Sequence, residues 1–281
     1  MKHRVPIRQP LTASQTRDRH DDADPGTRRS VAKVGTVAWV QDTRGWLSAS
    51  ERRELLRPLA AAHLRNAVGR TRLALHLHPG RHAHVAPERL EPPRTVLARR
   101  AEEAAARRLP PVLLHHSRRT FRFGLALGVV TGTEVDEELL YAAAMLHDTG
   151  LLTSSGDADF TLESSRVARG VAEQVGLSQE ATTIVLDAIT LHHSPGVGHA
   201  HGAVAQLLSA GAAADVTGLH TWQLPDDVRS DTVALHPREG FKDVFTQAFR
   251  EEAARVPEGR ARFLHRYGAF AAAIRLAPFA E

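Results

Sequence analysis

The sequence predicts an all-α protein, a helical bundle with an N-terminal accessory segment. From Thr95 onward, long Ala- and Leu-rich segments carry apolar residues at helical intervals and are separated by short turn signals. No segment shows the sustained alternation of apolar and polar residues that is typical of a strand. Hydrophobic residues make up 42% of the 281 residues, which is enough to bury a sizeable core. We therefore expect a globular protein built from helices.

The chain is expected to divide into three regions. Residues 1–30 are rich in Arg, Asp, Ser, Thr and Pro and have little apolar periodicity, so they predict a disordered or loosely held arm. Residues 31–94 form the accessory helical region, with one helix expected over 49–68. Its last part, 76–94, combines His, Pro and Gly and is typical of a loop. Residues 95–281 are expected to form the main domain.

Eight helices are expected in the main domain, since its apolar residues recur at helical spacing and Gly176 marks a helix end. The expected helices cover residues 95–108, 110–131, 136–147, 160–175, 178–193, 200–217, 238–255 and 258–275. No internal repeat of fixed period is present.

The composition excludes several kinds of protein and of site. The chain has no cysteine, so a metal would have to use His, Asp or Glu. No apolar run approaches the ~20 residues that span a bilayer, and the charged N-terminus lacks the apolar segment of a secretory signal. The 36 Lys and Arg residues are interspersed with 32 Asp and Glu residues, unlike a basic nucleic-acid-binding face. We expect a cytoplasmic protein with a small-molecule substrate and no nucleic-acid or membrane partner. The sequence leaves open whether the chain forms a homo-oligomer.

A histidine and an aspartate stand side by side at the end of an apolar run, in "AAAMLHDTGLL" at residues 142–152. Ionisable groups are costly to bury unless they are paired or bind a metal. Neighbours on a helix face ~100° apart, so His147 and Asp148 can share one ion only near a helix terminus, which Gly150 would supply. Imidazole and carboxylate ligands suit zinc, iron or manganese. Other polar residues on apolar helices are His115, His116, His192, His193 and Asp215.

The order of these residues resembles the HD superfamily of metal-dependent hydrolases, and within it most closely the cyanamide hydratase group. The resemblance covers roughly residues 95–220 and rests on "HSRRTFRFG", "LHDTG", "FTLESSRVA", "AITLHH" and "LLSAGAAADVTG". It implies an all-helical HD-domain bundle that holds one or two divalent metals, with Zn²⁺ as the first choice and Fe or Mn as alternatives. The ligands that it implies are His116, His147, Asp148 and Asp215.

Further roles follow from the same resemblance. The implied catalytic residues are Asp148, His192 and Arg119. Ser117 and Arg119 lie beside the first ligand and would orient it or the substrate. A second metal, or a proton shuttle, would use His192, with His193 and Glu163 as the other candidates. Glu163 could instead form only a surface ion pair with Arg166, and His115 is expected to face away from the ligands.

The resemblance implies chemistry with a metal-activated water, whose pKa a divalent metal lowers to ~7. In a hydratase, hydroxide would add to the carbon of a small cyano substrate while His192 or Asp148 delivers a proton to nitrogen. The alternative is a phosphohydrolase acting on a nucleotide or phosphoester. No lysine follows the doublet closely, so phosphate would need arginines such as Arg118, Arg119 or Arg166. A di-iron oxygenase and a non-catalytic binding module are less favoured.

A second histidine-rich tract lies in the loop that precedes the main domain. It includes His76, His78, His82 and His84, among Pro and Gly residues. Such tracts can bind metals adventitiously. We expect these four side chains to be exposed and to have no catalytic role.

Overall fold

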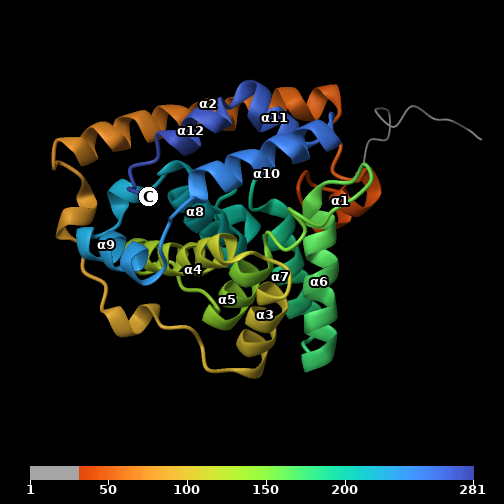
Figure 1. The fold of residues 1–281 in the computed structure, drawn as a ribbon, viewed down its shortest axis with the longest axis horizontal. Helices are drawn as coiled ribbons and strands as arrows, with labels where there is room; N and C mark the ends of the chain where they lie inside the picture. The colour runs from red at the N-terminus through yellow and green to blue at the C-terminus, as the bar shows by residue number, and fades with distance from the viewer. Residues whose placement is uncertain (1–31) are drawn as a thin grey trace, which may run out of the picture.

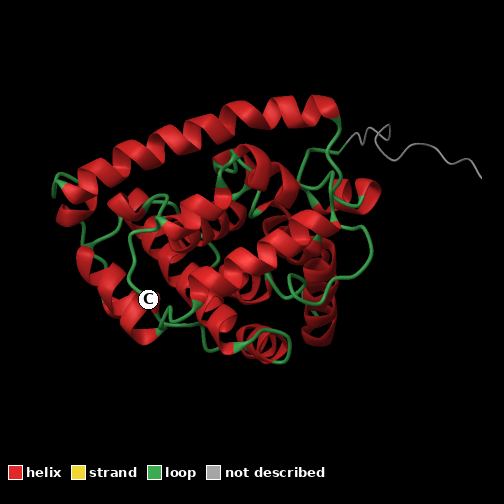
Figure 2. Cartoon of the chain, turned by 45° about the horizontal axis from the view of Figure 1, so that its top comes forward, coloured by secondary structure: helices red, strands yellow, loops and turns green. Residues whose placement is uncertain are grey.

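The computed structural model describes residues 32–281, and the helical bundle that it shows confirms the predicted fold class (Figure 2). Within this range there are twelve α-helices and no strand, apart from an isolated antiparallel bridge between Trp46 and Gly259. The arm predicted at residues 1–30 lies outside the described residues. No described helix combines the length and the apolar composition needed to cross a membrane.

Figure 1 shows the order of the elements along the chain. The helices are α1 (Val37–Thr43), α2 (Ala49–Ala74), α3 (Val96–Ala106), α4 (Pro111–Thr131), α5 (Glu137–Leu146), α6 (Phe160–Val175), α7 (Gln179–Leu191), α8 (Ala203–Thr217), α9 (Asp226–Leu235), α10 (Phe241–Arg255), α11 (Arg260–Tyr267) and α12 (Phe270–Arg275). Short 3₁₀ turns occupy Pro79–His82, Pro87–Leu90, His199–His201 and Thr221–Gln223.

Helices α3 to α8 and α10 begin and end within three residues of the predicted ranges. The helix predicted over 258–275 is wrong in one respect, because α11 ends at Tyr267 and α12 begins at Phe270. Between them Ala269 adopts a positive φ of 44°, which no continuous α-helix contains. Helices α1 and α9 were not predicted, and α2 runs six residues beyond its expected end at 68.

The centre of the bundle is the close crossing of α4 and α8 (Figure 1). Gly124 of α4 faces Gly211 of α8 at this crossing. A Cβ atom at Gly124 would lie 2.6 Å from the carbonyl oxygen of Leu207, and one at Gly211 would overlap the carbonyl oxygen of Thr120. The two backbones therefore approach more closely than larger residues allow. This contact brings the C-terminal half of α8 against the histidine-bearing half of α4.

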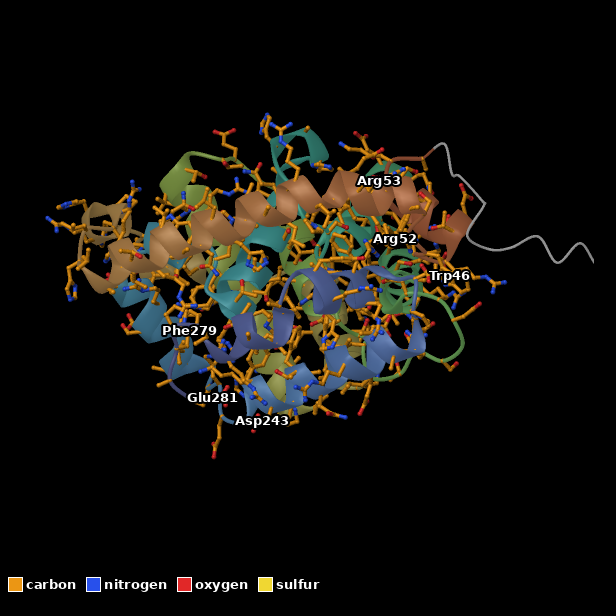
Figure 3. The ribbon with its side chains drawn as sticks, turned by 90° about the horizontal axis from the view of Figure 1, so that it is seen from above. Trp46, Arg52, Arg53, Asp243, Phe279 and Glu281 are labelled. Atoms are coloured by element: carbon orange, nitrogen blue, oxygen red, sulfur yellow. The ribbon has the colours of Figure 1, made fainter. Side chains whose placement is uncertain are left out.

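Helix α2 forms an outer layer that lies across the C-terminal helices, as Figure 1 and Figure 3 show from two directions. A Cβ atom at Gly69 would overlap the ring of Trp222, so the helix backbone rests directly on that indole. Asn66 donates from Nδ2 to the carbonyl oxygen of Thr217 at 3.3 Å. Arg52 pairs with Glu258 near the other end of the helix. Helix α2 is thus packed against later parts of the chain near both of its ends.

The C-terminal segment returns to the start of α10, where Figure 3 labels Asp243, Phe279 and Glu281. The backbone N–H of Lys242 donates to the Glu281 carboxylate at 2.6 Å. Phe279 stacks on Phe123 of α4 with ring centroids 5.7 Å apart. These contacts hold the start of α10 against α4, next to the candidate site described below.

The exposure predicted for the histidine-rich tract is wrong for His78, which is 2% exposed. Gly80, in the 3₁₀ turn that follows, packs against the backbone of Leu224, and this contact places His78 beneath the surface. The Nε2 atom of His78 lies 3.3 Å from Asp226 of α9. His76, His82 and His84 are exposed as expected.

Candidate metal centre

The doublet lies where α5 ends. Helix α5 stops at Leu146, His147 is its C-cap, and Asp148 falls in the following turn. The hydroxyl of Thr149 donates to the carbonyl oxygen of Leu146 at 2.8 Å, and the N–H of Gly150 donates to Ser164 at 2.9 Å. Because the chain turns out of the helix here, the two neighbouring side chains can approach the same point.

His192 occupies the same position at the end of another helix. It is the C-cap of α7, and its Nδ1 donates to the carbonyl oxygen of Ile189 at 2.7 Å. His147 likewise donates from Nδ1 to the carbonyl oxygen of Ala144 at 2.7 Å. Both contacts place the ring proton on Nδ1, since a carbonyl can only accept, and leave Nε2 directed at Asp148. The Nε2 atom of His192 lies 3.5 Å from Oδ1 of Asp148.

His116 comes from α4 and is oriented by Asp215 of α8. Its Nδ1 lies 2.7 Å from Oδ2 of Asp215, so its Nε2 also faces the doublet. The ring is held from the side by Phe241, with which it stacks at a centroid distance of 5.0 Å. Both His116 and Asp215 are fully buried. A ligand histidine whose second nitrogen is held by a carboxylate is a recurrent feature of metal sites.

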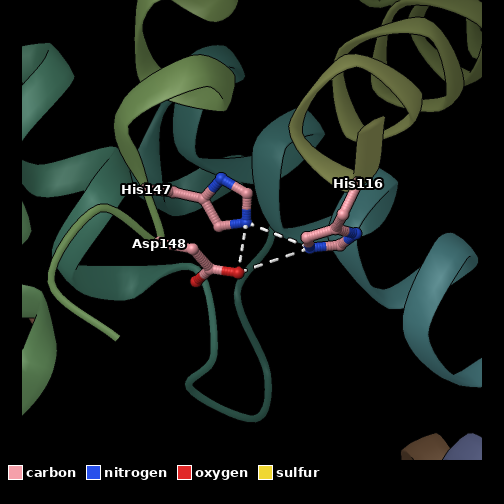
Figure 4. A group of neighbouring side chains, drawn as sticks. All are labelled: His116, His147 and Asp148. Carbon is pink, nitrogen blue, oxygen red and sulfur yellow. Dashed lines mark hydrogen bonds and ion pairs between the residues drawn. The ribbon is translucent and has the colours of Figure 1, made fainter. Parts of the chain in front are cut away.

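Three atoms from these residues form a triangle of close, buried ligand positions (Figure 4). The Nε2 atoms of His116 and His147 are 3.2 Å apart, and both face Oδ2 of Asp148, at 3.5 and 3.2 Å. Ligands bound tetrahedrally to zinc at 2.0–2.2 Å lie about 3.3–3.5 Å from one another. The spacing of His116, His147 and Asp148 therefore fits one face of a metal coordination sphere.

Asp148 is a buried carboxylate without a hydrogen-bond donor. It is 1% exposed, and neither of its oxygens accepts a hydrogen bond from the described residues. Burial alone would raise the pKa of Asp148, but the positive charge that the facing imidazoles carry when protonated, His147 first, outweighs burial and lowers the pKa. Burial lowers the pKa of His192 well below the ordinary histidine value. The buried carboxylate thus needs a positive charge beside it, and a divalent cation held by the imidazole nitrogens would supply that charge in place of their protons.

Two arginines also bind the carboxylate of Asp215. Arg119 binds the carboxylate in a bidentate manner, donating from Nε at 2.8 Å and from Nη2 at 2.9 Å. Arg238 donates to Oδ1 and also to the backbone carbonyl of Asp215. These three side chains are at most 1% exposed. Sequence reasoning missed Arg238, which stands in the loop before α10, where no periodic pattern marks it as buried.

The remaining predicted site residues lie apart from the triangle. His193 turns toward Asp159, with its Nε2 atom 3.5 Å from Oδ2. Glu163 is half-buried on α6 and pairs with Arg108 at 3.5 Å and with Arg166 at 3.4 Å. The group of residues whose ligand atoms all lie within 4.8 Å of one another contains His116, His147 and Asp148, and does not contain Asp215.

The residues flanking the first ligand are also placed by the structure. Ser117 is fully buried, and its hydroxyl has no hydrogen-bond partner among the described residues. The ring of His115 lies 5.8 Å from that of His236, on a face of α4 different from that of His116. Neither residue approaches Asp148 in the described contacts.

A cavity of about 330 Å³ opens onto the triangle. His116, His147, Asp148 and His192 contribute to its inner end, and residues of α2 to its outer end. The arginines considered for phosphate binding, Arg118, Arg119 and Arg166, are not among its lining residues. The candidate metal centre is therefore reached through a space that these three guanidinium groups do not border.

Comparison with known families identifies an HD domain at residues 113–239. Members of this family are generally metal-dependent hydrolases that bind divalent metals. The matched segment contains all four predicted ligands, begins within α4 and ends before α10, and covers somewhat less than half of the chain. A search of curated proteins returned no significant match. The segments on either side of the HD domain, including α2 and α10 to α12, lie outside this likeness.

Proposed function

We propose that this HD-domain chain is a metal-dependent enzyme that adds water to an uncharged substrate, with the cyano group of a small molecule as the reacting group. The reaction is that of the cyanamide hydratase group, which the sequence resembles. The observation that carries the proposal is the buried triangle of His116, His147 and Asp148, whose carboxylate has no donor among the described residues. A buried anion facing two imidazole nitrogens favours a bound cation over any neutral alternative.

The three residues of the triangle would hold the metal, for which zinc is our first choice and iron or manganese the alternatives. When bound, such a metal supplies a water molecule that loses a proton near neutral pH and polarises the bond under attack. Ala144 fixes the ring of His147 through its carbonyl oxygen, and Asp215 fixes the ring of His116. Both contacts keep the Nε2 lone pairs directed at the metal position, which favours binding.

His192 is the residue that we propose for proton transfer. Burial holds the pKa of His192 well below the ordinary value, so its imidazole is neutral. Its Nε2 atom lies 3.5 Å from Oδ1 of Asp148, and the residue lines the cavity. It can accept a proton from the attacking water and return it to the substrate nitrogen. A second cation, if one binds, would be held by Nε2 of His192 and by the Oδ1 atom of Asp148 that faces it.

Arg119 is a positioning residue in this proposal. All of its described hydrogen bonds go to Asp215 and to the backbone carbonyls of His236 and Pro237. The side chain is fully buried and does not line the cavity. Its part in the reaction is to hold Asp215, and through it His116, in place.

Phosphohydrolysis is the second candidate, and the cavity gives it less support. A phosphoryl group needs cationic side chains to neutralise its developing charge. Arg118 is instead bonded to Glu102 at 2.6 Å, and Arg166 is exposed and paired with Glu163. A di-iron oxygenase is supported less again, because His193 and Glu163 face other partners.

Metal content and turnover in two variants test the proposal. The chain purified without chelator should carry about one metal per chain and hydrate cyano compounds in preference to phosphoesters. Asp148→Asn should lose both the metal and turnover, because it removes the anionic ligand. His192→Gln should keep the metal and lose turnover. A metal-free wild-type chain that remains active, or equal metal loss in both variants, would contradict the assignment.

A further inference from the structure

The cavity is much larger than a small cyano compound needs. Its volume of about 330 Å³ falls at the lower end of the range for pockets that enclose drug-sized molecules. It extends from Asp148 outward to α2, between α8 on one side and α10 and α12 on the other. A linear molecule of three or four heavy atoms would occupy only its inner end. The shape of the site therefore carries information about the rest of the substrate.

The cavity wall next to the metal centre is aromatic. The ring of Phe245 lies 5.4 Å from that of His116, and Phe249 follows one turn later on α10. Phe270 of α12 packs against Phe249 at a centroid distance of 4.4 Å. All three phenylalanines line the cavity, and leucine and alanine side chains of α8 face them. An apolar body placed here would be removed from water on two sides.

The cavity has little fixed charge. Among its lining residues, all of them described, Arg65 and Asp148 alone carry a permanent charge. Asp148 belongs to the metal centre, and Arg65 is exposed. A substrate with a charged body would leave that charge without a partner along the aromatic wall, which is costly. The lining therefore favours an uncharged molecule.

The outer end of the cavity offers a hydrogen-bond acceptor. Asn66 of α2 donates from Nδ2 to the Thr217 carbonyl oxygen, and its Oδ1 atom is buried without a partner among the described residues. Asn66 lines the cavity. An unpaired buried acceptor favours a ligand that brings an N–H or O–H donor.

We infer that the substrate is an uncharged molecule with an apolar body of several carbons and a hydrogen-bond donor at its far end, and that α2 selects it. The reactive group lies at Asp148, and this part of the inference rests on the proposed function. The apolar body lies along Phe245, Phe249 and Phe270. The donor meets Asn66. Helix α2 lies outside the HD-domain match, so this selectivity belongs to the accessory region.

The inference is tested by binding, with ligands that the enzyme cannot turn over by hydration. Primary amides from acetamide to octanamide are the products of the corresponding nitriles. Their affinity for the metal-loaded chain, measured by isothermal titration calorimetry, should rise about fourfold for each added methylene until the cavity is filled. An affinity that stays flat from acetamide to octanamide would overturn the inference.

A matched pair of variants on α2 locates the apolar body. Ala62 lines the cavity, whereas its neighbour Ala61 is exposed and does not. Ala62→Phe should fill the outer cavity and lower octanamide affinity by at least tenfold, while acetamide binding stays within twofold. Ala61→Phe adds the same ring to the same helix and should leave both affinities unchanged. Equal behaviour of the two variants would remove α2 from the site.

Diamides of the same chain lengths test the donor. For at least one length, replacing the terminal methyl by a carboxamide should improve affinity about tenfold, a typical gain for one hydrogen bond. Asn66→Leu should abolish this gain and leave the monoamides within twofold of the wild type. No gain at any length would overturn the assignment of the donor. Rising amide affinity without any nitrile hydration would overturn the proposed reaction and leave the substrate shape standing.

Discussion

At the scale of single residues, the orientation of His116 depends on a carboxylate that faces two guanidinium groups. Asp215 accepts hydrogen bonds from Arg119, from Arg238 and from His116. Burial alone would raise the pKa of Asp215, but the two arginines lower it, so the carboxylate stays ionised. An ionised partner strengthens the hydrogen bond from Nδ1 and the basicity of Nε2.

Weakening this support should reduce metal affinity without touching a ligand. Arg119→Gln removes the bidentate hydrogen bonds to Asp215. We expect this variant to lower metal affinity by about 10- to 100-fold, as measured by competition with a chelator. Arg118→Gln is the matched control, because the neighbouring Arg118 binds Glu102 instead. If both variants bind metal equally well, Asp215 does not act through these arginines.

The sequence contained enough to predict that His116 lies close to the His147–Asp148 doublet, and too little to predict the partners of the other candidate residues. An adjacent His and Asp in an apolar run indicated His147 and Asp148, because burying them without a partner is costly. The direction of the Asp215 carboxylate depends on Arg238, which comes from a distant loop without periodicity. The same holds for His193, whose ring turns to Asp159 through contacts that no local pattern encodes.

At the scale of elements, one of the contacts that attach α2 is a close approach of its backbone to an aromatic ring. The backbone at Gly69 lies against the indole of Trp222, in a space that no Cβ could share. Few residues of this long helix are buried, while Leu56, Leu64 and Val68 are exposed. The fit at this glycine therefore contributes to the position of α2 over the cavity.

Gly69→Ala should push α2 away from Trp222 and destabilise the protein by about 1–3 kcal/mol, as overpacking of a tight contact does. Gly170→Ala is the control, since a Cβ at this helical glycine meets nothing within 4 Å. It should stabilise the protein by about 0.5–1 kcal/mol through helix propensity. Urea unfolding of both variants measures the difference. Equal stability would show that the ring of Trp222 moves aside without destabilising the protein.

Periodicity predicted the elements of the bundle well where the apolar stripe is continuous, as in α4 and α6. It failed where tertiary contacts set the backbone. The positive φ at Ala269 divides α11 from α12, although the sequence around it has good helix formers. Helix α9 was missed because only Val228 and Thr232 are buried along it, too few to show a repeat.

At the scale of the whole molecule, a buried acidic network joins α6 to α10 and α11. Glu252 of α10 accepts the N–H of Phe160 at 2.9 Å and pairs with Arg255. Nearby, Asp159 accepts from Arg260 at 3.1 Å. Burial, assisted by the negative charge of Asp159, raises the pKa of Glu252 to about 7. This carboxyl is therefore protonated over a pH range in which an unfolded chain would have lost the proton.

The stability of the protein should depend on pH through Glu252. Its pKa is about 7 when folded and 4.5 as the ordinary value, so the folded state binds the extra proton between these values. The free energy of unfolding should fall by about 3 kcal/mol from pH 4.5 to 7, relative to Glu252→Gln. Denaturant titrations across this range measure the difference. The exposed neighbour offers a control, since Glu251→Gln should follow the wild type.

The fold class could be predicted for residues 32–281, because helical periodicity extends over most of this range. The cavity could not be predicted, since it is assembled from α2, α8, α10 and α12, and no local pattern specifies which surfaces meet. The HD-domain match at residues 113–239 has the same limit, because it contains the ligands and leaves out α2, α10 and α12.

The contacts of α2 with the C-terminal helices have a consequence for translation. Arg52 pairs with Glu258, and Arg70 with the Leu276 carbonyl, each across 206 residues of chain. Both partners are therefore synthesised after residues 113–239, and α2 can form these two contacts only when the chain is nearly complete. The final seating of α2 over the cavity is thus a late event in the synthesis of the chain.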